Sequence, residues 1–137
     1  MIPGSPELVG LDTNVILRAV LQDDPGQAPA AAALMRSLNA QRRGFITSAT
    51  LAEVYWVLSR TVRLPRADSL GVISRLIHSE ALEFDDNEGV VRALHFAQQG
   101  ADFADALIHE TMQQFGVTET VTFDRRAAGR LGWRLLA

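Results

Sequence analysis

Short apolar runs alternate with longer segments of helical periodicity along the chain. The runs predict buried strands over residues 8–11, 44–47, 82–84, 120–123 and 133–136. The longer segments predict helices over residues 15–21, 27–38, 50–60, 66–78, 88–99 and 103–115. Strands that alternate with helices favour a parallel sheet covered by helices on both faces. In such a sheet the ligand site lies beyond the carboxyl ends of the strands.

The length and composition are those of one domain. The 137 residues are 47% apolar, which is enough for a single core, and we expect one domain over residues 1–137. No stretch approaches the roughly 18 apolar residues of a membrane span. Residues 1–7 lack the features of a secretory signal, and we expect them to be flexible or partly a cloning remnant. The absence of cysteine excludes thiolate chemistry and fits a cytoplasmic protein.

The charges narrow the possible functions. There are 16 acidic and 13 basic residues, and every basic residue is an arginine. The lack of lysine excludes a lysine phosphate loop, Schiff-base chemistry and a Ser–Lys pair. Proteins that bind nucleic acid through bulk positive charge are basic, whereas this chain has a net charge of −3. If it binds nucleic acid, clustered arginines or a metal ion must supply the positive charge.

An acid follows each of two predicted strands. Asp12 comes directly after the first strand, and Asp124 comes directly after the fourth. Each could cap the helix that follows, because aspartate accepts hydrogen bonds from the free amides of a first helical turn. Since both lie at one edge of the predicted sheet, a functional role and a capping role explain the pattern equally well.

A third acid, Glu53, lies within a predicted helix. It could form a capping box with Thr50. However, the residues three and four positions away are small or apolar, namely Ala49, Thr50, Trp56 and Val57. This pattern predicts that Glu53 lies on a core-facing stripe, where a carboxylate needs a partner. We therefore favour a functional role for Glu53.

Two further acids open the helix over residues 103–115. Asp102 could be its N-cap, and Asp105 lies in the first turn, where the helix dipole favours an acid. The two carboxylates are three residues apart, so they share a helix face and repel each other. A cation between them would remove this repulsion.

Together, Asp12, Glu53, Asp105 and Asp124 can lie at one edge of the sheet. A group of carboxylates without cysteine or nearby histidine suits a hard cation, Mg²⁺ or Mn²⁺, and does not suit zinc. Such a site polarises a phosphodiester and activates water for in-line attack.

These motifs resemble those of the PIN-domain ribonucleases, specifically the VapC toxins of bacterial toxin–antitoxin pairs. The matching segments are Gly-Leu-Asp-Thr-Asn-Val at 10–15, Leu-Ala-Glu-Val at 51–54, Asp-Phe-Ala-Asp-Ala-Leu-Ile at 102–108 and Thr-Phe-Asp at 122–124. They occur in the family's order and span most of the chain. The resemblance implies that Asp12, Glu53, Asp105 and Asp124 hold the metal. It also implies that Asn14 and Thr122 are polar residues beside the metal ligands, and that Asp102 is an acid outside the ligand set.

The resemblance implies a three-layer α/β/α sandwich with a short parallel sheet of about four to five strands. The implied reaction is Mg²⁺-dependent endonucleolytic cleavage of RNA, with Mn²⁺ as a substitute. The implied partners are the RNA substrate, a second copy in a homodimer and a VapB-type antitoxin. Six arginines are then candidate phosphate contacts: Arg42, Arg43, Arg60, Arg63, Arg125 and Arg126.

Other functions fit the sequence less well. A phosphohydrolase with an aspartate nucleophile would need Asp-x-Asp after the first strand, where this chain has Asn14. A phosphoacceptor receiver domain would need a lysine. A PIN nuclease for RNA processing or structured nucleic acid stays open as an alternative. A non-catalytic PIN binding module is disfavoured because all four acids are present.

Overall fold

The computed structural model describes residues 7–137, so residues 1–6 of the segment expected to be flexible lie outside the described part, whereas Glu7 of that segment belongs to a strand. Its elements, in order, are β1 (Glu7–Gly10), α1 (Thr13–Leu21), α2 (Ala28–Ser37), β2 (Arg42–Ile46), α3 (Ser48–Trp56), the π-helical turn η1 (Val57–Thr61), α4 (Arg66–Ile77), β3 (Leu82–Phe84), α5 (Asn87–Gln98), α6 (Phe103–Gln114), β4 (Val121–Thr122), α7 (Arg125–Leu131) and β5 (Arg134–Leu135). The α/β fold class is confirmed. No helix among residues 7–137 has the length and apolar character needed to cross a membrane.

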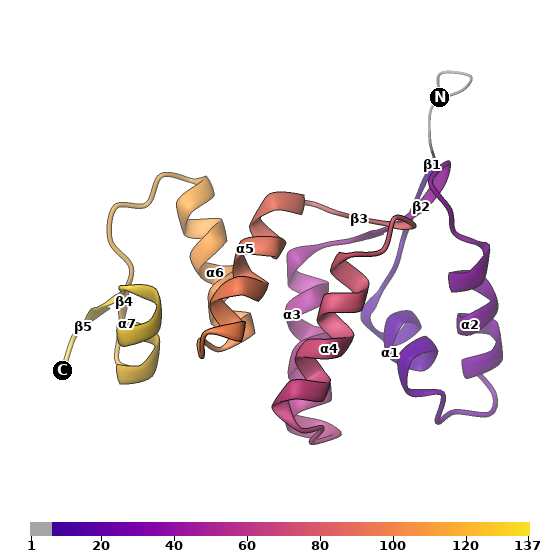
Figure 1. Ribbon diagram of the computed structural model, residues 1–137, viewed down its shortest axis with the longest axis horizontal. Helices are drawn as coiled ribbons and strands as arrows, with labels where there is room; N and C mark the ends of the chain where they lie inside the picture. The colour runs from indigo at the N-terminus through magenta and orange to yellow at the C-terminus, as the bar shows by residue number, and fades with distance from the viewer. Residues whose placement is uncertain (1–6) are drawn as a thin grey trace.

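The first three strands form a parallel sheet in the order β1-β2-β3. In its register, Gly10 lies beside Phe45, and Ile46 lies beside Phe84. The helices α1 and α3 start shortly after the carboxyl ends of β1 and β2 (Figure 1). This arrangement places the residues that follow these strands at one end of the sheet, as parallel strands require.

The last two strands form a separate parallel sheet, β4-β5. The sequence predicts one sheet of four to five strands, whereas the five parallel strands are divided between two sheets. Each of the last strands has only two residues, and they are joined by hydrogen bonds from Arg134 N to Thr120 O and from Leu136 N to Thr122 O, both 2.8 Å. The α5–α6 pair lies between this small sheet and the first one in Figure 1. The apolar pattern of a strand does not specify which strand it pairs with.

The core connects the first sheet to α3, α4, α5 and α6. Its fully buried side chains include Ile46, Leu51, Ile73 and Phe103. Phe103 packs edge-on against Tyr55, with ring centroids 5.4 Å apart. This contact fixes the start of α6, and therefore Asp102 and Asp105, against α3.

Close packing also explains a glycine at the centre of the first sheet. A Cβ atom added at Gly44 would lie 2.6–2.9 Å from side-chain carbons of Leu11, Leu82 and Leu38. Real Cβ atoms essentially never come this close to other atoms, so three leucines can meet over β2 only because residue 44 has no side chain.

Candidate functional site

Asp12 lies at the carboxyl end of β1 and is the N-cap of α1. Its Oδ1 accepts a hydrogen bond from Val15 N at 3.1 Å. Its side chain also lines a cavity of about 520 Å³ together with Asn14 and Arg18. The capping role is therefore real, and it leaves the exposed carboxylate beside a cavity.

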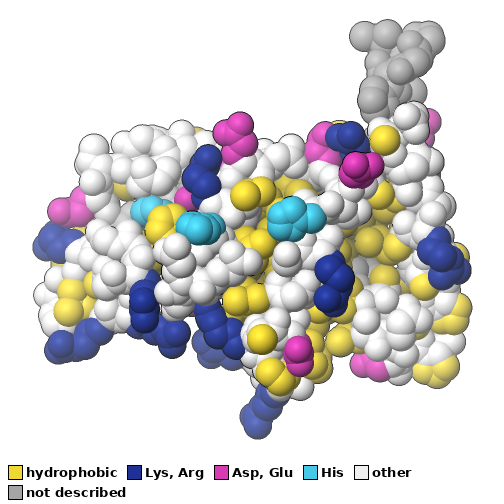
Figure 2. Space-filling view, in the orientation of Figure 1, with side chains coloured by type: hydrophobic (Ala, Val, Ile, Leu, Met, Phe, Trp, Pro, Cys, Tyr) yellow, Lys and Arg dark blue, Asp and Glu magenta, His cyan; other side chains and the backbone are white. Residues whose placement is uncertain are grey.

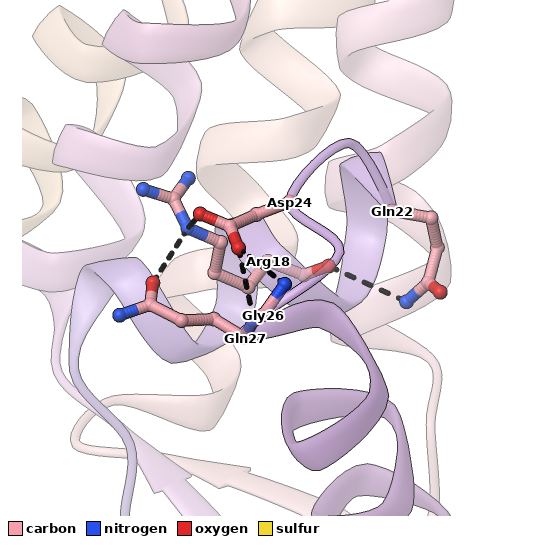
Figure 3. Close-up of polar contacts among 5 residues, drawn as sticks. All are labelled: Arg18, Gln22, Asp24, Gly26 and Gln27. Carbon is pink, nitrogen blue, oxygen red and sulfur yellow. Dashed lines mark hydrogen bonds and ion pairs between the residues drawn. The ribbon is translucent and has the colours of Figure 1, made fainter.

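Arg18 is held in place at this cavity by the loop between α1 and α2 (Figure 3). Its Nε donates to Gln27 Oε1 at 2.9 Å and lies 3.6 Å from Asp24 Oδ2. Asp24 Oδ1 accepts from the backbone amides of Gln27 and Gly26, and these bonds lower the pKa of Asp24. The guanidinium of Arg18 is therefore fixed at the Asp12 cavity. The sequence did not predict this position, because the position depends on how the loop between α1 and α2 folds.

A second cavity, of about 680 Å³, lies at the amino ends of α6 and α7. Asp102, Asp105 and Asp124 line it together with Arg60, Arg66 and Arg126. Asp102 is the N-cap of α6 and accepts from Asp105 N at 3.0 Å. Asp124 is the N-cap of α7 and accepts from Arg126 N at 2.8 Å and Ala127 N at 3.0 Å. Two caps of separate helices thus bring acids to one cavity.

Asp105, which lines this cavity, has a perturbed pKa. Partial burial raises the pKa of Asp105, and the nearby charges of Asp102 and Asp124 raise it further, whereas Arg60 lowers it. These causes show that Asp105 and Asp124 are electrostatic neighbours. A carboxyl group with such a raised pKa is typical of a functional site.

The arginines of this cavity also hold the backbone together. Arg126 donates to Gly100 O through Nε at 3.2 Å and Nη2 at 3.0 Å. Arg66 donates to the carbonyls of Ala97 and Ala101. Arg66 can donate to these carbonyls because α4 packs near the end of α5. The position of Arg66 in the sequence does not by itself indicate this role.

Thr122 lies near the second cavity, whereas two of the candidate phosphate-binding arginines lie elsewhere. Thr122 Oγ1 accepts from Asp124 N at 2.9 Å, which places it beside that acid. Arg42 and Arg43 lie instead at the start of β2 and form ion pairs with Glu7 at 3.3 Å and Glu83 at 3.5 Å. This is the end of the sheet opposite the carboxyl edge.

Glu53 does not occupy the environment that its neighbours predict. The helix α3 starts at Ser48 and is capped by Thr47, which accepts from Thr50 N at 3.1 Å, so the capping box is excluded. The predicted core-facing stripe is wrong, because Glu53 is exposed and Trp56 is 53% exposed. The buried face of α3 is formed by Leu51, Val54 and Tyr55. Glu53 lines neither cavity described above.

The acids have the right chemistry for a hard cation, and three of the four predicted ligands line two cavities. Within residues 7–137, no group of three or more histidine or acidic side chains is arranged to hold a metal ion. Asp12 lines one cavity, whereas Asp105 and Asp124 line another. The separation follows from the division of the sheet, because Asp12 follows β1 and Asp124 follows β4. Of the four predicted ligands, Asp105 and Asp124 therefore share a cavity, whereas Asp12 and Glu53 do not line it.

Comparison with known proteins gives the family of the chain. No curated protein matches the sequence at a significant level. The family model of the PIN domain matches residues 9–131, which include all four predicted acids and both cavities' acidic side chains. PIN domains have a nuclease-type fold and typically use divalent metal ions. The chain belongs to the PIN domain family.

Proposed function

We propose that this protein is a Mg²⁺-dependent endoribonuclease, with Mn²⁺ as a substitute, and that it is the toxin of a VapBC-type pair in the cytoplasm. The observation that carries the proposal is the cavity in which Asp102, Asp105 and Asp124 lie among three arginines. Membership of the PIN domain family supports a nuclease activity. The proposed partners are RNA, a VapB-type antitoxin and a second copy of the chain.

The cavity suits a phosphodiester chain for an electrostatic reason. Guanidinium groups bind phosphate oxygens with two parallel hydrogen bonds, and Arg60 and Arg126 line the same cavity as the acids. Figure 2 shows arginine side chains gathered along the lower edge of this face, over α7 and the lower ends of the central helices. A local basic border lets a chain with a net charge of −3 meet a polyanion.

The four proposed ligands are Asp12, Glu53, Asp105 and Asp124. A divalent cation bound to such carboxylates supplies Lewis-acid polarisation of the phosphate and a more acidic water. The shared cavity of Asp105 and Asp124 supports this ligand set.

The direct test is cleavage of RNA by homogeneous protein. We expect cutting with Mg²⁺ or Mn²⁺, none with excess chelator, and a loss of about 100-fold or more in Asp105→Asn, as for loss of a catalytic carboxylate. Glu80→Gln is the matched control, because Glu80 is exposed and lies in the turn before β3. Undiminished cutting in chelator, or equal rates for Asp105→Asn and Glu80→Gln, would contradict the proposal.

A further inference from the structure

Trp56 is a large aromatic side chain that the fold leaves open to solvent at the second cavity. It lies at the end of α3, is 53% exposed and lines the cavity together with Asp105 and Asp124. A single exposed apolar side chain is common on protein surfaces and needs no explanation. Trp56 differs because its indole borders a cavity of acids and arginines, where an aromatic ring adds nothing to the core.

The core holds the backbone at Trp56 in place. The preceding residue, Tyr55, is 5% exposed and packs edge-on against Phe103 at the start of α6. Successive residues of a helix point about 100° apart, so Tyr55 can enter the core while Trp56 faces the cavity. A tryptophan on a fixed backbone offers a large contact area and loses little conformational entropy on binding. Trp56 is therefore a rigid aromatic surface beside the proposed metal ligands.

Arg60 lies four residues after Trp56 and lines the same cavity. It belongs to the π-helical turn η1, and such turns are frequent at functional sites. The guanidinium groups of Arg66 and Arg126 donate to backbone carbonyls, whereas the side chain of Arg60 is exposed. An exposed guanidinium can donate two parallel hydrogen bonds to a phosphate. The cavity therefore presents an aromatic face and a cation side by side along one helical segment.

We propose that Trp56 stacks on an unpaired base of the RNA strand while Arg60 binds a neighbouring phosphate. Both side chains then act as positioning residues for the strand at the second cavity. In a duplex each base is covered by its neighbours, so stacking on Trp56 selects an unpaired segment. Every base has an aromatic face, so this contact tolerates different sequences. The inference deepens the proposed nuclease function and rests on it for the identity of the substrate.

Tryptophan fluorescence tests the stacking directly, because the chain has only two tryptophans. Trp133→Phe leaves Trp56 as the single indole, and Trp56→Phe leaves Trp133. Both variants also carry Asp105→Asn, so that an unstructured RNA oligonucleotide can be bound in Mg²⁺ without being cut. We expect the RNA to quench the emission of Trp133→Phe and to leave that of Trp56→Phe unchanged. No quenching of Trp133→Phe by saturating RNA, or equal quenching of both variants, would overturn the stacking.

Binding of an end-labelled oligonucleotide separates the stacking from the charge contact. Trp56→Leu should weaken binding of the single strand by about 10-fold, as for the loss of one stacked base, and should leave its salt dependence unchanged. Arg60→Gln should instead reduce the slope of log affinity against log salt by about 1. Phe115→Leu is the matched control and should bind normally, because Phe115 is 79% exposed but lies at the end of α6 opposite the cavity.

A duplex of the same strand tests the selection of unpaired RNA. Trp56→Leu should bind the duplex as the wild type does, so the preference for the single strand should fall by about 10-fold. The proposal is overturned if Trp56→Leu and Phe115→Leu bind the single strand equally well, or if Trp56→Leu changes only the oligomeric state. A wild type that cuts RNA no faster than Trp56→Leu would contradict the stacking alone. A wild type whose Trp56 is quenched by RNA that it never cuts would uphold the stacking and contradict the nuclease function.

Discussion

At the scale of single residues, the aspartates have two roles at once. Asp12, Asp102 and Asp124 are each the N-cap of a helix, and each also lines a cavity. Capping holds each carboxylate at a defined place, because the side chain is tied to a backbone amide. Asp105 differs, since its side chain caps nothing and burial raises its pKa. The charged form of Asp105 therefore destabilises the folded state.

The charge of Asp105 makes a prediction for stability against pH. As the pH rises, the unfolded state releases this proton first, because the folded pKa is raised by burial, Asp102 and Asp124. Wild-type stability should therefore fall as the pH passes from the ordinary aspartate pKa through the raised one. In metal-free buffer, Asp105→Asn should melt at the same temperature as the wild type or higher at about pH 7, and this advantage should disappear near about pH 4.

Thermal melting of both proteins across this range measures the effect. If Asp105 only stabilises the helix dipole, Asp105→Asn instead loses about 0.3–1 kcal/mol at neutral pH. Added Mg²⁺ should stabilise the wild type more than the variant, because a bound ligand stabilises the folded state by mass action. Equal losses with and without Mg²⁺ would make Asp105 a structural residue.

At the scale of elements, the α5–α6 pair supports the second cavity. Glu110 on α6 is only 5% exposed, and Arg92 on α5 donates to its Oε1 at 2.7 Å. The hydrogen bond and charge of Glu110 raise the pKa of the Arg92 guanidinium. The turn after α5 requires a glycine, because Gly100 has φ +114° and its carbonyl binds Arg126. These contacts position the start of α6, where Asp102 and Asp105 lie.

The buried carboxylate makes this pair sensitive to one substitution. Arg92→Ala should clearly lower the free energy of unfolding, because Glu110 is left charged and buried without its partner. The double variant Arg92→Ala/Glu110→Gln should recover part of the loss, since no charge is then buried. Urea unfolding measures both. Glu88→Gln is the control, because Glu88 lies 3.8 Å from Arg92 but is exposed, and an exposed pair contributes about 0–1 kcal/mol.

At the scale of the whole molecule, the four proposed metal ligands are distributed over different elements. The first sheet carries Asp12 after β1, and the second carries Asp124 after β4. The helices between them hold Glu53 and Asp105. We expect cleavage activity to depend on each of these acids, because each is a proposed metal ligand.

The proposed toxin role makes a prediction in cells. Expression of the wild-type chain should slow bacterial growth, whereas Asp12→Asn should not, because it lacks one proposed metal ligand. Growth curves at matched protein levels measure the difference, with Glu80→Gln as a variant that should stay toxic. Co-expression of the small neighbouring gene should relieve the effect and give a complex that purifies together. If the wild type and Asp12→Asn were equally harmless, the RNA-processing alternative would be favoured.

Local patterns in the sequence determined the elements and the helix caps. The strands before Asp12 and Asp124 and the helix that starts after Asp102 follow from apolar periodicity and capping preferences, which act over a few neighbouring residues. The order of the four acidic motifs was likewise enough to indicate the PIN family, which the match over residues 9–131 confirms.

Only the tertiary structure decided which elements meet. The exposure of Glu53 was not predictable, because the apolar residues around it on α3 are themselves partly exposed. The division of the strands into two sheets was likewise not predictable, because strand pairing is set by contacts between distant segments. The positions of Arg18 and Arg66 also depend on such contacts, with Gln27 and with the end of α5. The sequence therefore determined which chemical groups are present, and the packing of distant elements decided which of them share a cavity.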